Sequence, residues 1–143
     1  MRILGLDVGT KTIGVAVSDP LGLTAQGVET IRRKSLAADL DALARLAEQY
    51  EAEEILIGLP LNMNGSEGPS VEMARSFGAA VAERLPLLPI IYRDERGSTV
   101  AATRILLEGD ISRGKRKKVI DKLAAVYVLQ GYLDYLRNQA AKT

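Results

Sequence analysis

The apolar segments of this 143-residue chain follow an order that restricts its fold. Three strand-like runs come first, at residues 2–7, 13–18 and 23–31, and the links between them are too short to hold a helix. Further along, apolar residues with helical spacing alternate with two more short apolar runs. A meander of strands followed by strands that alternate with helices predicts an α/β fold with a mixed sheet flanked by helices.

The later part of the chain contains signals for individual elements. Ser35 is a predicted N-cap, because apolar residues recur at helical spacing after it. Pro69 suits the first turn of another helix. These patterns predict helices at 35–50, 70–85, 98–109 and 119–138, strands at 54–59 and 88–92, and a turn-rich loop at 60–69. We expect one domain over residues 1–138 and a frayed tail at 139–143. Tyr127, Tyr132 and Tyr135 of the last helix are core, stacking or contact residues, and core positions are favoured.

Two absences narrow the chemistry: the chain contains no histidine and no cysteine. Ser-His-Asp and Cys-His catalysis, an imidazole base and nearly all zinc sites are therefore excluded. Carboxylates without imidazole or thiolate favour hard ions such as Mg²⁺ or Mn²⁺. The 19 Lys and Arg residues balance 18 Asp and Glu residues, so only local clusters of charge can indicate a nucleic-acid partner.

The sequence also bears on location. It has no apolar stretch long enough to cross a membrane, and the apolar run at the N-terminus is cut short by Asp7. The absence of cysteine rules out a disulfide framework of the kind that exported proteins use. We therefore expect a cytoplasmic protein with no membrane partner.

Asp7 is the first candidate for chemistry because it ends an otherwise apolar strand. A lone carboxylate there is costly unless it is hydrogen-bonded, paired or bound to metal. Gly9 allows the backbone to approach a ligand closely, and Thr10 and Lys11 add a hydroxyl and a charge suited to a phosphate. The alternative is an ordinary β-turn in which Asp7 and Gly9 are turn formers.

Two further segments combine acidic and basic residues. Arg93-Asp94-Glu95-Arg96 follows a predicted strand, and ligands bind beyond the carboxyl ends of parallel strands in open α/β sheets. Five of the six residues at 113–118 are basic, and Asp121 follows early in the last predicted helix. Cations just before a helix N-terminus oppose its dipole, and a bound phosphate would relieve that cost. The alternatives are charged, solvated loops at both places.

The loop that follows the strand at 54–59 is the last candidate. Gly58-Leu59-Pro60 and Gly65-Ser66-Glu67-Gly68-Pro69 lead into a helix N-terminus, where backbone N–H groups can bind an anion. Asn62 is the side chain of this loop that we expect to contact nucleic acid. The alternative is a plain connection rich in turn residues.

Taken together, these segments suit the hydrolysis of phosphodiester bonds. Three carboxylates come from two strand ends and a late helix, and a basic segment accompanies them. Two metal ions about 4 Å apart activate a water and stabilise the leaving oxygen in such reactions, and carboxylates hold both ions.

Four blocks of the sequence resemble the YqgF (RuvX) family, and together they span essentially the whole chain. The blocks are GLDVGTKTIGVAVSD at 5–19, GLP and GSEGP within 58–69, DER followed by Ser98-Thr99, and KRKK leading to DKLAA at 115–125. The resemblance implies an RNase H-like fold related to the RuvC-type resolvases, with a mixed five-stranded sheet of strand order 3-2-1-4-5 flanked by helices. Members are described as Holliday junction resolvases and as nucleases that mature the end of precursor small-subunit ribosomal RNA.

The same resemblance implies roles for individual residues. Asp7, Glu95 and Asp121 are the expected catalytic, metal-binding carboxylates, Asp94 is the alternative second ligand, and Mg²⁺ or Mn²⁺ is the expected cofactor. The expected nucleic-acid contacts are Lys11, Asn62, Arg96, Lys115, Arg116, Lys117 and Lys118. Gly97 departs from the family pattern, in which a bulkier residue is usual, but it removes no catalytic group.

We therefore expect a two-metal nuclease that takes part in 5′-end maturation of precursor 16S rRNA. A Holliday junction resolvase is the alternative, and symmetrical cleavage of a four-way junction would require a homodimer. One rival from another class is a phosphotransferase of the actin-like and sugar-kinase superfamily, but such enzymes need two domains of this kind and 143 residues supply one. The other is a nucleic-acid-binding module without catalysis.

Overall fold

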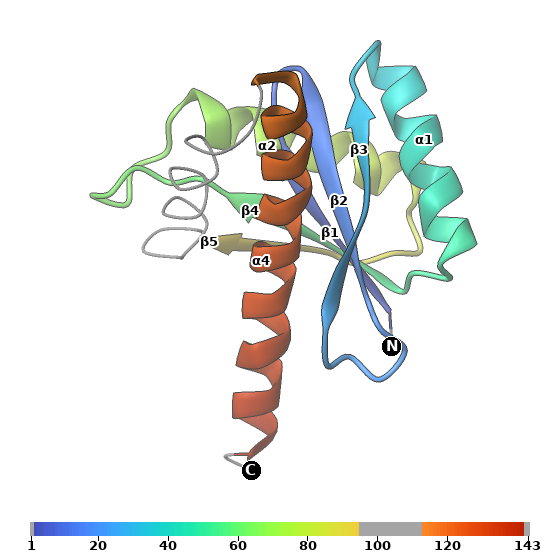
Figure 1. Cartoon of the computed structure of the whole chain (residues 1–143), viewed down its shortest axis with the longest axis vertical. Coiled ribbons are helices and arrows are strands. Elements are labelled where there is room, and N and C mark those ends of the chain that lie inside the picture. The colour runs from blue at the N-terminus through green and yellow to red at the C-terminus, as the bar shows by residue number, and fades with distance from the viewer. Residues whose placement is uncertain (1, 95–112, 142–143) are drawn as a thin grey trace.

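The computed structural model describes residues 2–94 and 113–141, with the backbone alone over 113–121. The elements follow the order β1, β2, β3, α1, β4, α2, β5 and α4 (Figure 1). The predicted helix at 98–109 lies outside the described residues. One sheet is formed by strands β1 (Ile3–Val8), β2 (Thr12–Ser18), β3 (Ala25–Arg32), β4 (Glu54–Leu59) and β5 (Ile90–Asp94).

The sheet is mixed, and its strand order is β3-β2-β1-β4-β5. β1 pairs antiparallel with β2 and parallel with β4, and β5 pairs parallel with β4. The predicted α/β class and the strand order implied by the resemblance are thus confirmed. The first three strands form a meander, and the two that follow alternate with helices, as the order of apolar segments predicted.

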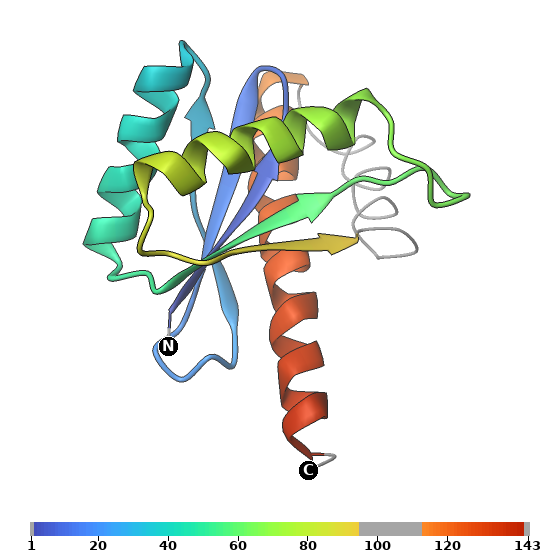
Figure 2. The same cartoon turned by 180° about the vertical axis from the view of Figure 1, so that it is seen from behind.

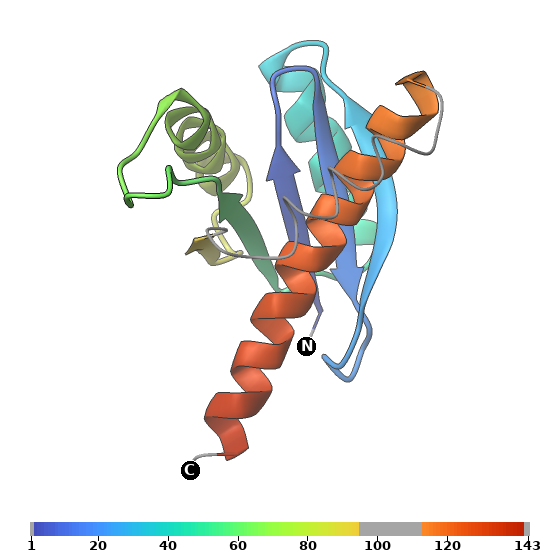
Figure 3. The ribbon, with the colours of Figure 1, turned by 60° about the vertical axis from the view of Figure 1, so that its left-hand side comes forward.

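Helices cover both faces of the sheet, which explains why its central strands are almost continuously apolar. α1 (Leu36–Gln49) and α2 (Pro69–Arg84) lie on one face, and α4 (Arg113–Ala141) crosses the other (Figures 2 and 3). Successive residues of a strand point to opposite faces. In β1, Leu4 and Leu6 therefore join the core beneath α1 and α2, whereas Ile3 joins a second core beneath α4.

Local sequence signals set the starts of two helices. The hydroxyl of Ser35 accepts a hydrogen bond from the backbone N–H of Ala38 at 3.1 Å, so Ser35 caps α1 as predicted. Pro69 is the first residue of α2, where its missing N–H costs no hydrogen bond. None of the described helices has the length and apolar character that a membrane span requires.

α4 is longer than the sequence analysis predicted, because it begins at Arg113 rather than at residue 119. The basic residues at 113–118 therefore belong to the first turns of the helix, and the expectation of a loop there was wrong. Lysine and arginine are good helix formers, and each residue added to an existing helix gains a hydrogen bond. Further along, Ala125 and Leu129 are fully buried and anchor the helix. The dipole cost of terminal cations, about 0.3–1 kcal/mol each, does not prevent this extension.

Two of the tyrosines expected in the core are exposed instead. Tyr127 and Tyr135 are 39% and 42% exposed. The C-terminal half of α4 extends past the end of the sheet, so parts of its surface face solvent (Figures 1 and 3). Tyr132 is half-buried, and its hydroxyl donates a hydrogen bond to the buried Glu54 carboxylate at 3.1 Å.

Candidate active site

Three parallel strands end at one edge of the sheet, and Asp7 lies at that edge. β1, β4 and β5 run in the same direction, and extending the β1–β4 register one residue past Leu6 and Ile57 brings Asp7 level with Gly58, which pairs with Arg93. Glu95 follows the last residue of β5 in the sequence, but it lies outside the described residues. The edge is therefore the place where an open α/β sheet binds ligands, as the sequence analysis predicted for these strand ends.

Asp7 belongs to the face of the sheet that α4 covers. Leu6 and Val8 on either side of it pack in the core beneath α1 and α2, so alternation directs Asp7 to the other face. Gly5, two residues earlier, confirms the orientation of this strand. A Cβ atom at Gly5 would lie 2.9 Å from Cβ of Leu129 in α4. The helix backbone thus lies directly against β1 just before the half-buried Asp7.

Residue 121 of α4 lies at about the same height as the end of β1. An added Cβ at Gly5 would lie 3.5 Å from the carbonyl oxygen of Ala125, and α4 runs antiparallel to β1 (Figure 1). Moving from Gly5 to Asp7 advances about 6.6 Å along the strand. Moving back from Ala125 to Asp121 advances about 6 Å in the same direction along the helix. The two positions thus lie at similar heights, although the Asp121 side chain is outside the described part of the chain.

The strand neighbours of Asp7 on its own face carry no side chains. The neighbouring positions on the same face are glycines: Gly5 in β1, Gly14 paired in β2, and Gly58 level in β4. No strand neighbour at these positions places a side chain beside the carboxylate. A carboxylate oxygen is a suitable ligand for a hard divalent ion. No three acidic side chains gather among those that the structure describes, a set that excludes Glu95 and Asp121.

Asp94, the alternative second ligand, belongs to the opposite face. Ile90 and Tyr92 of β5 pack against the core beneath α1 and α2, and Ile91 packs beneath α4. Arg93 also lies on the α4 face, because its guanidinium is 5.6 Å from the ring centre of Tyr135. Strand alternation therefore places Asp94 with Tyr92, away from the face of Asp7.

The loop after Asp7 is held by Arg33, a residue that the sequence analysis did not identify. Arg33 Nη1 donates to the carbonyl oxygen of Gly9 at 3.0 Å, and its backbone N–H donates to the carbonyl oxygen of Lys11 at 2.9 Å. Arg33 Nε is also 2.9 Å from the Oδ2 atom of Asp39, whose side chain is 3% exposed. The guanidinium lies 5.2 Å from the ring centre of Phe77 in α2. Arg33 thus joins the loop to both helices on the far face.

One sequence signal pointed to this contact. Asp39 precedes Leu43 by one helical turn, so it shares the buried side of α1 with an apolar residue. A carboxylate at such a position requires a partner, since burying an unpaired charge is very costly. The pattern predicts that Asp39 has a cationic partner, and only the fold shows that this partner is Arg33.

The predicted nucleic-acid contacts lie at different places. Lys11 is exposed at the tip of the loop that joins β1, the strand of Asp7, to β2. Asn62 is exposed in the loop after β4, but its side-chain amide donates to the Ser66 hydroxyl at 3.0 Å, which gives it a structural role in the loop. The backbone of residues 115–118 forms the first turns of α4, and Arg96 lies outside the described residues.

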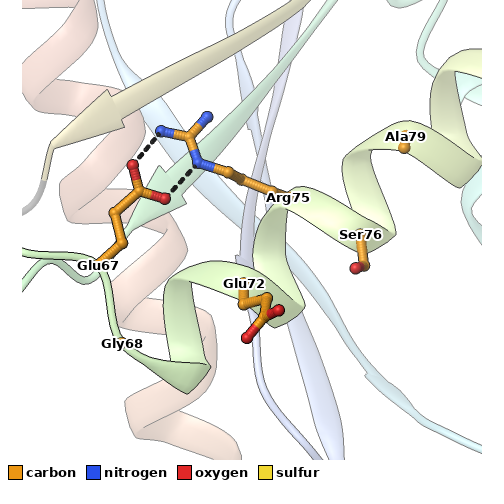
Figure 4. Close-up of a pocket in the computed structure, with 6 residues that line it drawn as sticks. All are labelled: Glu67, Gly68, Glu72, Arg75, Ser76 and Ala79. Carbon is orange, nitrogen blue, oxygen red and sulfur yellow. Dashed lines mark hydrogen bonds and ion pairs between the residues drawn. The ribbon is translucent and has the colours of Figure 1, made fainter.

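A groove of about 460 Å³ on the α2 face has a different character (Figure 4). Its lining includes Glu67, Glu72 and Arg75, and the Glu67 carboxylate pairs with Arg75 through two hydrogen bonds of 2.8 and 3.1 Å. This bond to Glu67 is the main cause that raises the pKa of Arg75. Because two acids outnumber one paired cation, the groove does not suit a polyanion.

Comparison with known proteins identifies the family. The sequence model of RuvX, described as Holliday junction resolvase, matches residues 1–135. The chain belongs to the RuvX family. A relative from Moorella thermoacetica is 60% identical over 136 residues, which cover 95% of this chain and 96% of that protein. A relative from Heliobacterium modesticaldum is 59% identical over 142 residues, covering 99% and 95%. Both RuvX relatives carry the name "Putative pre-16S rRNA nuclease".

Solved structures place this RuvX chain among the RNase H-like folds. RuvC of Thermus thermophilus in complex with a Holliday junction substrate aligns with a TM-score of 0.60 at 13% identity, covering 97% of this chain and 96% of that one. The fowlpox virus resolvase with Holliday junction DNA aligns with a TM-score of 0.56 at 13% identity, covering 95% and 99%. At these identities the likeness concerns the fold. The family and the RNase H-like fold that the resemblance implied are confirmed.

Proposed function

We propose that this RuvX protein is a cytoplasmic, divalent-metal-dependent endonuclease that takes part in 5′-end maturation of precursor 16S rRNA. The observation that carries the proposal is the position of Asp7, on the α4 face at the carboxyl end of β1 and level with residue 121 of α4. This arrangement supports convergence of two of the three carboxylates that the family resemblance implies. The names of the relatives support the RNA substrate.

Asp7, Glu95 and Asp121 would hold the ions. Alternation in β5 favours Glu95 over Asp94, because Asp94 lies on the face opposite Asp7. Mg²⁺ or Mn²⁺ held there would activate a water and stabilise the leaving oxygen, in the two-metal manner. The chain has no imidazole to serve as a base, so its own contribution is to hold carboxylates close together and to bind the phosphates.

Cations supplied by the protein would bind the substrate. Lys11 extends from the loop beside Asp7, and the basic residues Lys115, Arg116, Lys117 and Lys118 follow one another in the first turns of α4. Phosphate at that helix end would be attracted by the N-terminal dipole as well as by the cations. Arg96, directly after Glu95 in the sequence, and Asn62 complete the proposed contacts.

The test compares wild type with Asp7→Asn on precursor 16S rRNA and on a synthetic four-way DNA junction. We expect Mg²⁺- or Mn²⁺-dependent cleavage of the RNA at the 5′ side of the mature sequence, and none by Asp7→Asn. Asp41→Asn, an exposed acid on α1, is the matched control and should cleave normally. Full activity of Asp7→Asn would contradict the mechanism. A non-catalytic module would cleave neither substrate in any variant.

The second candidate function is Holliday junction resolution, which the description of the family model favours. It predicts paired, symmetrical cuts in the four-way junction and no cut in the precursor RNA. It also requires two active sites, so the active species should be a dimer by sedimentation. A monomer that cuts only the RNA would exclude it.

A further inference from the structure

Three exposed cations surround the end of the β1–β2 hairpin, and we call them the basic rim: Lys11, Arg32 and Lys34. We propose that the basic rim binds phosphates of the substrate strand beside the cleaved bond, so that the strand crosses the hairpin end past Asp7. The inference rests on the proposed nuclease function and adds Arg32 and Lys34 to its binding surface.

Backbone pairing brings these residues together. Arg32 ends β3 opposite Thr12 in β2, and the N–H of Arg33 donates to the carbonyl oxygen of Lys11 at 2.9 Å. The rim therefore lies around the turn of the β1–β2 hairpin, whose first strand carries Asp7. Arg33 also bonds the carbonyl oxygen of Gly9 at 3.0 Å, so the loop that carries Lys11 is held in place against β3.

The rim reaches both faces of the sheet edge. Ile31 is 5% exposed and packs beneath α1 and α2, so alternation directs Arg32 to the α4 face, which Asp7 shares. Two strand spacings, about 10 Å, separate β3 from β1. Lys34 lies on the other side, where it lines a groove of about 400 Å³ together with Thr10 and Ser35. A strand bound by all three cations would cross the edge of the sheet beside Asp7.

The charge of this groove suits a polyanion. Its only acidic lining residue is Asp39, which is buried, pairs with Arg33 at 2.9 Å and accepts the backbone N–H of Lys34 at 3.1 Å. Within the described part of the chain, no carboxylate pairs with the rim cations. The groove on the α2 face differs, since its arginine is paired and two acids line it. In a protein with a net charge of only +1, the hairpin end thus carries a local excess of cations.

The test measures binding apart from cleavage. In an Asp7→Asn background, the affinity for fluorescein-labelled single-stranded RNA and for a four-way DNA junction is measured over a range of salt concentrations. The rim variant is Arg32→Met with Lys34→Met. The matched control is Arg45→Met with Arg84→Met, which removes the same charge from exposed positions in the middle of α1 and at the end of α2. Thermal melting of each variant shows that it folds.

Losing two phosphate contacts to a single strand should reduce the slope of log K against log salt by about 1.4. The Kd for the RNA should then rise about 20-fold in 0.1 M salt. The control pair should change the Kd and the slope little. A rim variant that binds like the control, on both nucleic acids, would overturn the inference. The two proposals can fail separately. If Asp7→Asn abolishes cleavage but the rim variant binds normally, the rim is not part of the binding surface and the proposed function still stands.

Discussion

Replacing Asp39 with alanine tests how much the protein depends on the buried ion pair behind its candidate active site. The substitution leaves Arg33 without its carboxylate partner and removes the acceptor of the Lys34 backbone N–H. Removing one member of a buried pair costs about 3–5 kcal/mol, because the other charge stays buried. Arg33 is 20% exposed and can be partly hydrated, so we expect the lower end, about 3 kcal/mol.

The assay is thermal and urea unfolding, with an exposed ion pair as the control. A loss of about 3 kcal/mol should lower the Tm by roughly 9 °C in a domain of this size. Asp41→Ala breaks the pair with Arg84, whose two side chains are 46% and 66% exposed, and should cost less than about 1 kcal/mol. The same loss of stability in Asp39→Ala and Asp41→Ala would refute the reasoning.

A double variant separates the ion pair from the loop contact. Arg33→Met with Asp39→Leu removes both charges, and apolar replacement of a buried pair is often neutral for stability. We expect the double variant to be more stable than Asp39→Ala. Its nuclease activity should still be reduced, because a methionine side chain cannot donate to the carbonyl oxygen of Gly9 as Arg33 does. If the loss of stability in the double variant equalled the sum of the losses in the two single variants, the two side chains would not be coupled.

The remaining predictions concern alkaline pH and helix glycines. Burial and the neighbouring Glu54 raise the pKa of Tyr132 to about 12 from an ordinary value near 10. The protonated hydroxyl therefore stabilises the fold below pH 10, and this contribution is lost as the pH rises towards 12. Tyr132→Phe should remove that part of the pH dependence in alkaline unfolding curves, and an unchanged curve would assign the loss to other groups. Gly78→Ala should destabilise the protein by about 1–2 kcal/mol. The added Cβ would lie 2.1 Å from the Tyr92 hydroxyl, and this overpacking outweighs a gain in helix propensity of about 1 kcal/mol. Gly131→Ala in α4 is its control: the nearest atom outside the helix would be 3.7 Å away, so this variant should be stabilised, and equal behaviour of both would contradict the packing argument.

Much of the local structure could be read from the sequence, because the signals concerned are local. Ser35 caps α1 through its own hydroxyl, and Pro69 starts α2 through its missing N–H. The predicted start of α4 was six residues too late, because the pattern of apolar residues begins only after the basic segment. A helix anchored by Ala125 and Leu129 extends into that segment, and no periodic signal is needed for it.

The chemistry of the candidate site could be predicted from the sequence, but the residues that hold the site in place could not. The absence of histidine and cysteine and the acid at the end of the first strand indicate carboxylates and hard metal from residue types alone. Arg33 was missed because Gly9 and Phe77 are distant from it in sequence, and its three partners, Asp39 included, lie in different parts of the fold. Of these partners, only Asp39 could be noticed in the sequence, because it is a charged residue on the apolar side of α1.

The sequence by itself determined the order of the elements, the class of chemistry and the similarity to a family, because these depend on residue identity and short-range spacing. The tertiary structure decided which groups share a face. Alternation shows that Asp7 and its neighbours project to opposite sides, but it does not show which side is which until helices bury both. α4 lies against β1 at Gly5, because no side chain is there to hold it away, and this contact sets position 121 at about the height of Asp7 along the strand. The same packing assigns Arg32 to that face and Asp94 to the other.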